Sequence, residues 1–215
     1  MKKIFLSIAA IIITCAANAQ KYPEPEFSNE VYFLKKDSVF SALRLEKNVS
    51  KMESKTKMGG LGGSESGYNM DGTKSTVRLT SGTKLSFIIS TGASSDKAYS
   101  SQDSMMKALG MDPSMMQGMM GGSNDPASTI TLYKTESEKG KRKILMQKNA
   151  GAVPFSSKKT KSSDKYTFSV KKIREGYWEL VIDKTLPRGE YAFSKMDMTG
   201  MNAGQSFLLF AFGID

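Results

Sequence analysis

The C-terminal run Phe207–Ile214 is apolar on both of the faces that a β-strand would present, which restricts the folds open to this chain. One face would carry Phe207, Leu209 and Ala211, and the other Leu208, Phe210, Phe212 and Ile214. A strand with one face in water alternates between apolar and polar residues, whereas this run does not. The pattern therefore predicts a strand that is covered on both faces.

A turn signal precedes this run, in the segment Leu186–Phe193. Pro187 fixes its own φ, and Gly189 permits a positive φ. Tyr191 and Phe193 then share one face of the following strand. A tyrosine in this position of a sandwich-type domain buries its ring and hydrogen-bonds its hydroxyl back to the corner, and we expect Tyr191 to do so.

Short alternating segments separated by turn signals recur along the rest of the chain. The clearest examples are Tyr166–Ile173 and Tyr177–Asp183, which Glu175-Gly176 joins. The other segments are Glu30–Lys35, Val39–Leu45, Ser75–Thr80, Thr83–Ser90, Ser128–Thr135 and Arg142–Lys148. We expect hairpins between Tyr68 and Thr80 and between Ser128 and Lys148, and a strand that frays into a loop over Ser50–Gly67. This spacing predicts an all-β fold, an antiparallel β-sandwich with a single domain over residues 20–215.

Residues 1–19 have the features of a signal peptide. Lys2 and Lys3 precede the apolar stretch Ile4–Cys15, and Ala17-Asn18-Ala19 fits a cleavage site before Gln20. A lipoprotein signal acylated at Cys15 is the alternative, although the residues before Cys15 lack its usual leucine and small side chain. We expect an exported protein of the periplasm, the outer-membrane surface or the extracellular space, with no transmembrane segment.

Composition narrows the chemistry of the expected mature chain. Cleavage would remove the only cysteine, Cys15, and the sequence contains no histidine. These absences exclude Ser-His-Asp and Cys-His catalysis and the usual zinc ligands. Removing Lys2 and Lys3 from the 31 basic residues leaves 29 against 21 acidic ones, a net charge of +8. We expect a non-catalytic protein without a cofactor, and an excess of positive charge that favours anionic envelope surfaces.

Residues 91–127 form an insertion with an unusual methionine content. The segment Ser101–Gly122 contains seven methionines, namely Met105, Met106, Met111, Met115, Met116, Met119 and Met120. Asp112 and Pro113 suit the start of a short helix, and Met115/Met119 and Met116/Met120 would be neighbours on it.

Three interpretations of the insertion remain open. The thioether side chains form a flap over one end of the core, or dock on a partner, or bind Cu(I) or Ag(I) through Met115, Met116, Met119 and Met120. A smaller set, Met196, Met198 and Met201, precedes the last strand. A location of both sets at one end of the sandwich would favour the second and third interpretations.

Several of these segments also resemble a group of uncharacterised secreted β-rich proteins of Gram-negative bacteria. The resemblance is carried by Gly72–Leu79 (G-T-K-S-T-V-R-L), by Leu186–Phe193 (L-P-R-G-E-Y-A-F) and by the F-G-I-D ending. Arg188 departs from the Pro-Gly doublet of that group. The resemblance implies a secreted β-fold and no particular chemistry.

Lysine-rich stretches over Lys139–Lys143 and Lys158–Lys165 complete the candidate binding features. They contain little aromatic side chain for base stacking, so we expect no nucleic-acid binding. Weak attraction to anionic envelope polymers is the functional alternative to a solvated loop. The sequence thus predicts a secreted or envelope interaction module, an accessory component of an outer-membrane or surface complex. The alternative is a Met-based Cu(I)/Ag(I)-binding protein.

Overall fold

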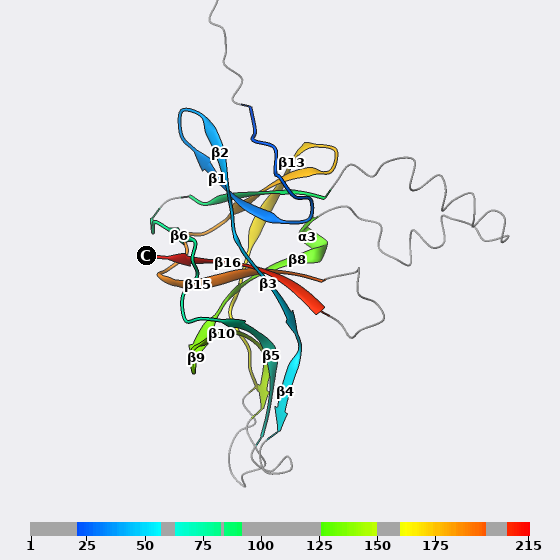
Figure 1. The fold of residues 1–215 in the computed structure, drawn as a ribbon, viewed down its shortest axis with the longest axis vertical. Helices are drawn as coiled ribbons and strands as arrows, with labels where there is room; N and C mark the ends of the chain where they lie inside the picture. The colour runs from blue at the N-terminus through cyan, green and yellow to red at the C-terminus, as the bar shows by residue number, and fades with distance from the viewer. Residues whose placement is uncertain (1–20, 57–62, 83, 92–125, 150–159, 197–205) are drawn as a thin grey trace, which may run out of the picture.

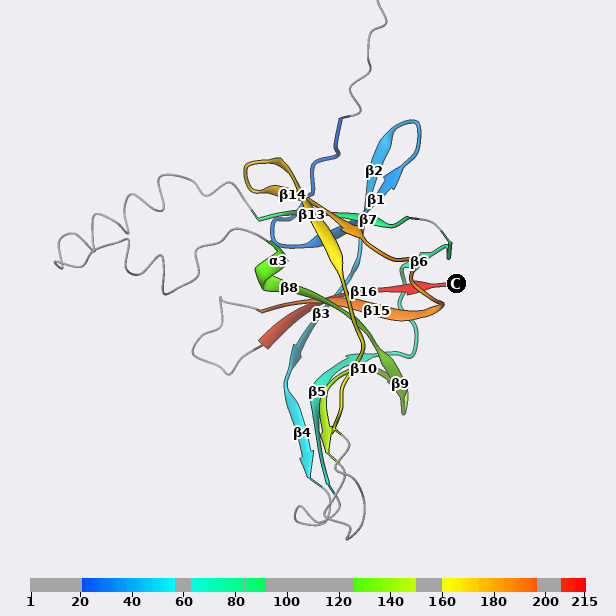
Figure 2. The same ribbon diagram turned by 180° about the vertical axis from the view of Figure 1, so that it is seen from behind.

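A computed structural model describes residues 21–56, 63–82, 84–91, 126–149, 160–196 and 206–215 of this chain. These residues form three β-sheets, with one short helix, α3 (Pro126–Thr129). Figures 1 and 2 show the sheets stacked along the long axis of the molecule, with one sheet between the other two. The strand pairs are antiparallel except for one short parallel pair at the C-terminus.

Sheet A is the five-stranded sheet that the upper part of Figure 1 shows. Its strands, in spatial order, are β13 (Phe168–Arg174), β14 (Tyr177–Ile182), β7 (Ser86–Ser90), β1 (Val31–Lys36) and β2 (Phe40–Arg44). The expected hairpin through Glu175-Gly176 is confirmed, because β13 pairs with β14.

Sheet B lies in the middle and contains the C-terminal strand. Its order is β12 (Lys165–Tyr166), β8 (Ile130–Lys134), β15 (Gly189–Met196), β16 (Ser206–Ile214) and β3 (Glu46–Lys51). The short strand β6 (Arg78–Leu79) runs parallel to the end of β16.

Sheet C extends away from the other two and comprises β11 (Thr160–Lys161), β10 (Lys141–Asn149), β5 (Ser64–Asp71) and β4 (Glu53–Thr56), with β9 (Glu136–Glu138) paired to β10. Strands β3 and β4 are separated only by Met52, so the chain passes directly from sheet B into sheet C. We name the outer part of sheet C the arm: β4, Ser64–Ser66 and Gln147–Asn149. Figure 1 shows it projecting from the body.

Two apolar cores explain why β16 is apolar on both faces. Phe210, Phe212 and Ile214 belong to the core between sheets A and B. Leu209 and Ala211 belong to a second core, with Tyr68, Met70 and Ile144 of sheet C. The prediction of a strand covered on both faces is confirmed, and the antiparallel β-sandwich gains a third layer.

The expected corner at Tyr191 is also present. Its ring is fully buried, and its hydroxyl donates a hydrogen bond to the carbonyl oxygen of Pro187 at 2.7 Å. Gly189 has a φ of 151°, in the range that glycine adopts readily. A Cβ at Gly189 would also lie 3.1 Å from Cε of Lys134, so the position favours glycine on two counts.

Two expected hairpins were wrong. Residues 68–71 belong to β5, which pairs with β4 and β10, whereas Arg78–Leu79 pairs with β16. Strand β8 pairs with β12 and β15, and only β9 forms a hairpin with β10. Both predictions assumed that strands adjacent in sequence pair with each other. Instead β8 pairs with β15, and β6 pairs with β16, both far away in sequence. The strand expected within Ser50–Gly67 is present as β4, although β4 is polar throughout and lacks an alternating pattern. The expected loop was wrong at Ser64–Gly67, which belong to β5.

Candidate functional site

The predicted Met-rich insertion and the shorter Met-containing stretch leave the sandwich at the same end. The methionines Met105, Met106, Met111, Met115, Met116, Met119 and Met120 lie outside the described residues. Their flanking residues are described: β7 ends at Ser90, and α3 leads into β8, whose Ile130 pairs with Lys195 of β15. Figures 1 and 2 place the ends of β7 and β15 and the starts of α3 and β16 on the same side of the molecule.

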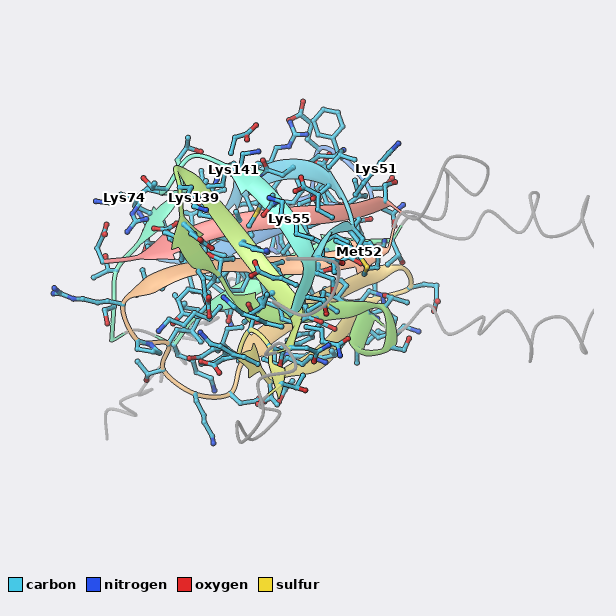
Figure 3. All side chains as sticks on the ribbon, turned by 90° about the horizontal axis from the view of Figure 1, so that it is seen from below. Lys51, Met52, Lys55, Lys74, Lys139 and Lys141 are labelled. Carbon is cyan, nitrogen blue, oxygen red and sulfur yellow. The ribbon has the colours of Figure 1, made fainter. Side chains whose placement is uncertain are left out.

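A band of exposed lysines crosses the molecule from this end towards the C-terminal end. We name it the lysine band: Lys51, Lys55, Lys74, Lys139 and Lys141. Figure 3, which views the molecule along the arm, shows the five side chains with Met52 distributed along one side. Met52 is itself 48% exposed.

The lysine band is weakly paired with acidic side chains. Lys55, Lys139 and Lys141 have acidic neighbours, Glu53, Glu138 and Asp71, at 3.7–3.8 Å, and each of these side chains is about half exposed or more. Pairs of this kind contribute about 0–1 kcal/mol. Within the described part of the chain, Lys51 and Lys74 form no salt bridge. The lysines are therefore available to another anion at little cost.

A tight hairpin positions three of the five lysines. Lys139 and Gly140 have φ values of 51° and 80°, which is the geometry of a two-residue type I′ turn between β9 and β10. The hydroxyl of Ser137 donates to the carbonyl of Thr73 at 3.1 Å. This bond ties the hairpin to the loop that carries Lys74, so Lys74, Lys139 and Lys141 are held in one region.

Next to the hairpin, a buried arginine connects sheet C to the central sheet. Arg142 is 1% exposed and forms an ion pair with Glu46 of β3. Its guanidinium also donates to the carbonyl oxygens of Asp71 and Gly72, at 2.9 and 3.2 Å. Burial raises the pKa of Glu46, but hydrogen bonds from Arg142, Asn48 and the Thr76 amide outweigh it and lower that pKa to about 2. Glu46 therefore stays ionised.

The residues that carry the family resemblance meet at the C-terminal end of sheet B. Arg78 pairs with Glu190 and with Asp215, and the amide of Ser75 donates to Glu190 at 2.8 Å. A Cβ at Gly213 would overlap the Arg78 guanidinium, so only glycine leaves room for it. The hydrogen bonds with Asp215 and Glu190 raise the pKa of Arg78. Every charge in this cluster has a partner, which suits a role in fixing the C-terminus.

Sequence reasoning missed these ion pairs, because the partners are far apart in sequence. Glu46 and Arg142, and Arg78 and Glu190, are separated by 96 and 112 residues. Another buried carboxylate, Glu179, is 2% exposed and pairs with Lys36 on the outer face of sheet A. In the described ranges no cluster of three or more His, Cys, Asp or Glu residues could hold a metal ion.

Comparison with known proteins gives no further assignment: no family model matches the chain, and no curated protein or solved structure matches it significantly. No helix among the described residues is long and apolar enough to cross a membrane.

Proposed function

We propose that this protein is a non-catalytic interaction module of the bacterial cell envelope, an accessory component of an outer-membrane or surface complex. In this proposal the lysine band holds the protein against an anionic envelope surface. The observation that carries it is the set of five exposed, weakly paired lysines, which come from sheet C, from the end of β3 and from two neighbouring turns.

Electrostatics supports this assignment. A lysine near an anionic surface contributes about 1 kcal/mol, provided that salt does not screen it. The band also has an apolar neighbour, Met52, beside its lysines. This combination suits a surface of phosphate or carboxylate groups over a less polar layer, such as lipopolysaccharide.

Charge reversal with a matched control tests the proposal. The variant with Lys74→Glu, Lys139→Glu and Lys141→Glu is compared with one carrying Lys84→Glu, Lys171→Glu and Lys184→Glu, exposed lysines outside the band. Both have the same net charge. We expect the first to lose roughly 100-fold in affinity for phosphatidylglycerol vesicles and lipopolysaccharide, since three lysines at about 1 kcal/mol each are reversed. Equal losses in both variants would mean that net charge alone, and not the band, drives binding.

The location of the two Met-containing stretches favours a second candidate for the same module. The described residues that flank both stretches lie at one end of the sandwich, and a common location of this kind is what docking of both stretches on one partner would require. Adaptable thioether side chains suit protein docking. Binding of Cu(I) or Ag(I) by Met115, Met116, Met119 and Met120 is the alternative.

Deletion of Ser101–Gly122 separates these roles. Loss of one envelope partner from a pull-down, with unchanged thermal unfolding, would support docking. Stoichiometric Cu(I) binding under reducing conditions that disappears with the deletion would support the metal. A deletion that unfolds the protein would leave the flap over the core as the role of the insertion.

A further inference from the structure

The outer face of sheet A contains an apolar site that the chain's own N-terminal segment fills. Tyr32, Leu34, Ile88 and Tyr177 form a cluster on this face and are each at most 4% exposed. The segment Lys21–Phe27, which we name the strap, lies over them without being a strand. A sheet face of this composition would be exposed in the absence of the strap, so the strap completes the fold there.

The site recognises the strap through specific side chains. The Tyr22 ring makes edge contacts with Phe40 and Tyr177, at centroid distances of 5.4 and 6.4 Å. Its hydroxyl donates to Glu179 at 2.9 Å. Burial and this carboxylate raise the pKa of Tyr22 to about 12, so the donor proton is retained.

The next residues of the strap also bind to side chains of sheet A. The Tyr177 hydroxyl donates to the carbonyl of Pro23, and Glu24 pairs with Arg174. Further along, the Arg44 guanidinium lies 4.4 Å from the centroid of the Phe27 ring. The groups that bind the strap thus come from β1, β2, β7, β13 and β14, which makes this a built site for an extended aromatic-proline-acid peptide.

Exchange of the strap would break no β-ladder, because the hydrogen bonds of Lys21–Phe27 to the sheet each involve a side chain. At the turn itself, the Asn29 amide donates to the carbonyl of Ser90 at 2.6 Å, and opening the turn would cost this bond. The strap joins β1 through a turn at Ser28-Asn29, and Asn29 has a φ of 62°. Asparagine adopts left-handed backbone more readily than most residues with a side chain, so the turn is tolerated here and most substitutions other than glycine would disfavour it. Opening the turn would free the strap. Because Lys21–Phe27 occupy the site, only Ser28-Asn29 would link the strap to β1, about 7 Å when extended, so two exchanging copies must place their turns side by side.

We propose that two copies of this chain exchange straps, so that the strap of each fills the outer site of sheet A in the other. The exchanged dimer makes the same side-chain contacts as the monomer and differs only at the turn. The cis strap acts at an effective concentration on the order of millimolar, which keeps dilute protein monomeric. A reciprocal exchange closes with twofold symmetry, and exchange of an identical element between protomers is a low-cost route to a dimer.

Substitutions at the turn test the exchange in the full chain. Asn29→Val and Asn29→Gly both remove the side-chain amide, which accepts a hydrogen bond from Lys195 at 2.6 Å. Only valine strongly disfavours the left-handed turn, by roughly tenfold or more. We expect the Asn29→Val variant to shift towards a dimer at concentrations where the Asn29→Gly variant stays monomeric, measured by light scattering on a sizing column and by native mass spectrometry.

A second change identifies the strap as the linking element. Adding Tyr22→Ala to Asn29→Val should return the protein to a monomer, because the ring and its hydrogen bond to Glu179 are lost. Asn29 is exposed, so the single variants should fold, which circular dichroism checks. Equal oligomeric states for the valine and glycine variants, or a dimer that persists after Tyr22→Ala, would overturn the proposal.

Discussion

Strand β16 and the arm are both antiparallel β-structure, yet they have opposite compositions. Residues Leu209–Ile214 of β16 are buried between two cores, while all four residues of β4 are exposed. Hydrophobic burial accounts for the first. The arm is held by its ladders within sheet C, and sheet C is held to sheet B by polar contacts, notably the Arg142–Glu46 pair. The stability of this molecule is therefore concentrated in the central sheet. The side chains of the arm contribute little to the core, so they can be charged without a loss of stability.

The largest effect should come from the central sheet. The Phe212 ring lies 5.0 Å from that of Phe87 and stacks on Tyr191 at 5.6 Å. We expect Phe212→Ala to lower the free energy of unfolding by about 3–5 kcal/mol, because it removes a buried ring and leaves a cavity. Denaturant unfolding measures this, with Ser54→Ala in the arm as the control. A small loss at Phe212 would mean that the two sheets repack around the cavity.

A smaller but still large loss of stability is expected where sheet C meets sheet B. Arg142→Ala would leave the Glu46 carboxylate without its principal partner, although Asn48 and the Thr76 amide remain. We expect a loss of about 3 kcal/mol, at the lower end for a broken buried pair. Hydrogen exchange should localise the change to β5 and β10. Uniform loss of protection across all three sheets would instead make the arm and the body one cooperative unit.

The same pair predicts how stability depends on pH. The pKa of Glu46 falls from 4.5 to about 2 on folding, so the carboxyl binds a proton less readily in the folded state. Its contribution is complete above pH 4.5 and is lost as the pH falls towards 2. Thermal unfolding of the wild type and of Glu46→Gln should therefore converge in this window. Parallel curves would assign the acid sensitivity to other carboxylates.

The sequence predicts the body of the molecule much better than the arm. The two-faced apolar pattern of β16 and the Pro187/Gly189/Tyr191 corner are set by local chemistry, and both predictions are confirmed. The hairpin of β13 and β14 is also confirmed, since a short turn joins two alternating segments. In contrast, β4 has no apolar residue to produce a pattern.

Long-range pairing limits what the sequence can say about the candidate site. The lysine band draws on β3, β4, β10 and two turns, and its members come together only when β9 and β10 fold against the loop at Thr73. Likewise, the strap site is made from β1, β2, β7, β13 and β14, and no local motif marks it. The sequence shows Tyr22 followed by Pro-Glu, but it does not indicate the hydrogen-bond partner of Tyr22, because Glu179 is 157 residues away.

The smallest stability effect should come from the arm surface, where function is proposed. The side chain of Lys55 is 69% exposed, and its only salt bridge among the described residues is with Glu53 at 3.7 Å. We expect Lys55→Ala to change the free energy of unfolding by less than about 0.5 kcal/mol, as surface substitutions usually do. Binding to phosphatidylglycerol vesicles should nevertheless weaken by roughly fivefold, which corresponds to about 1 kcal/mol per lysine. Unfolding and vesicle titrations on the same preparation measure both quantities. A stability loss above about 1 kcal/mol without weaker binding would show that Lys55 supports the arm rather than a ligand, and would remove it from the lysine band.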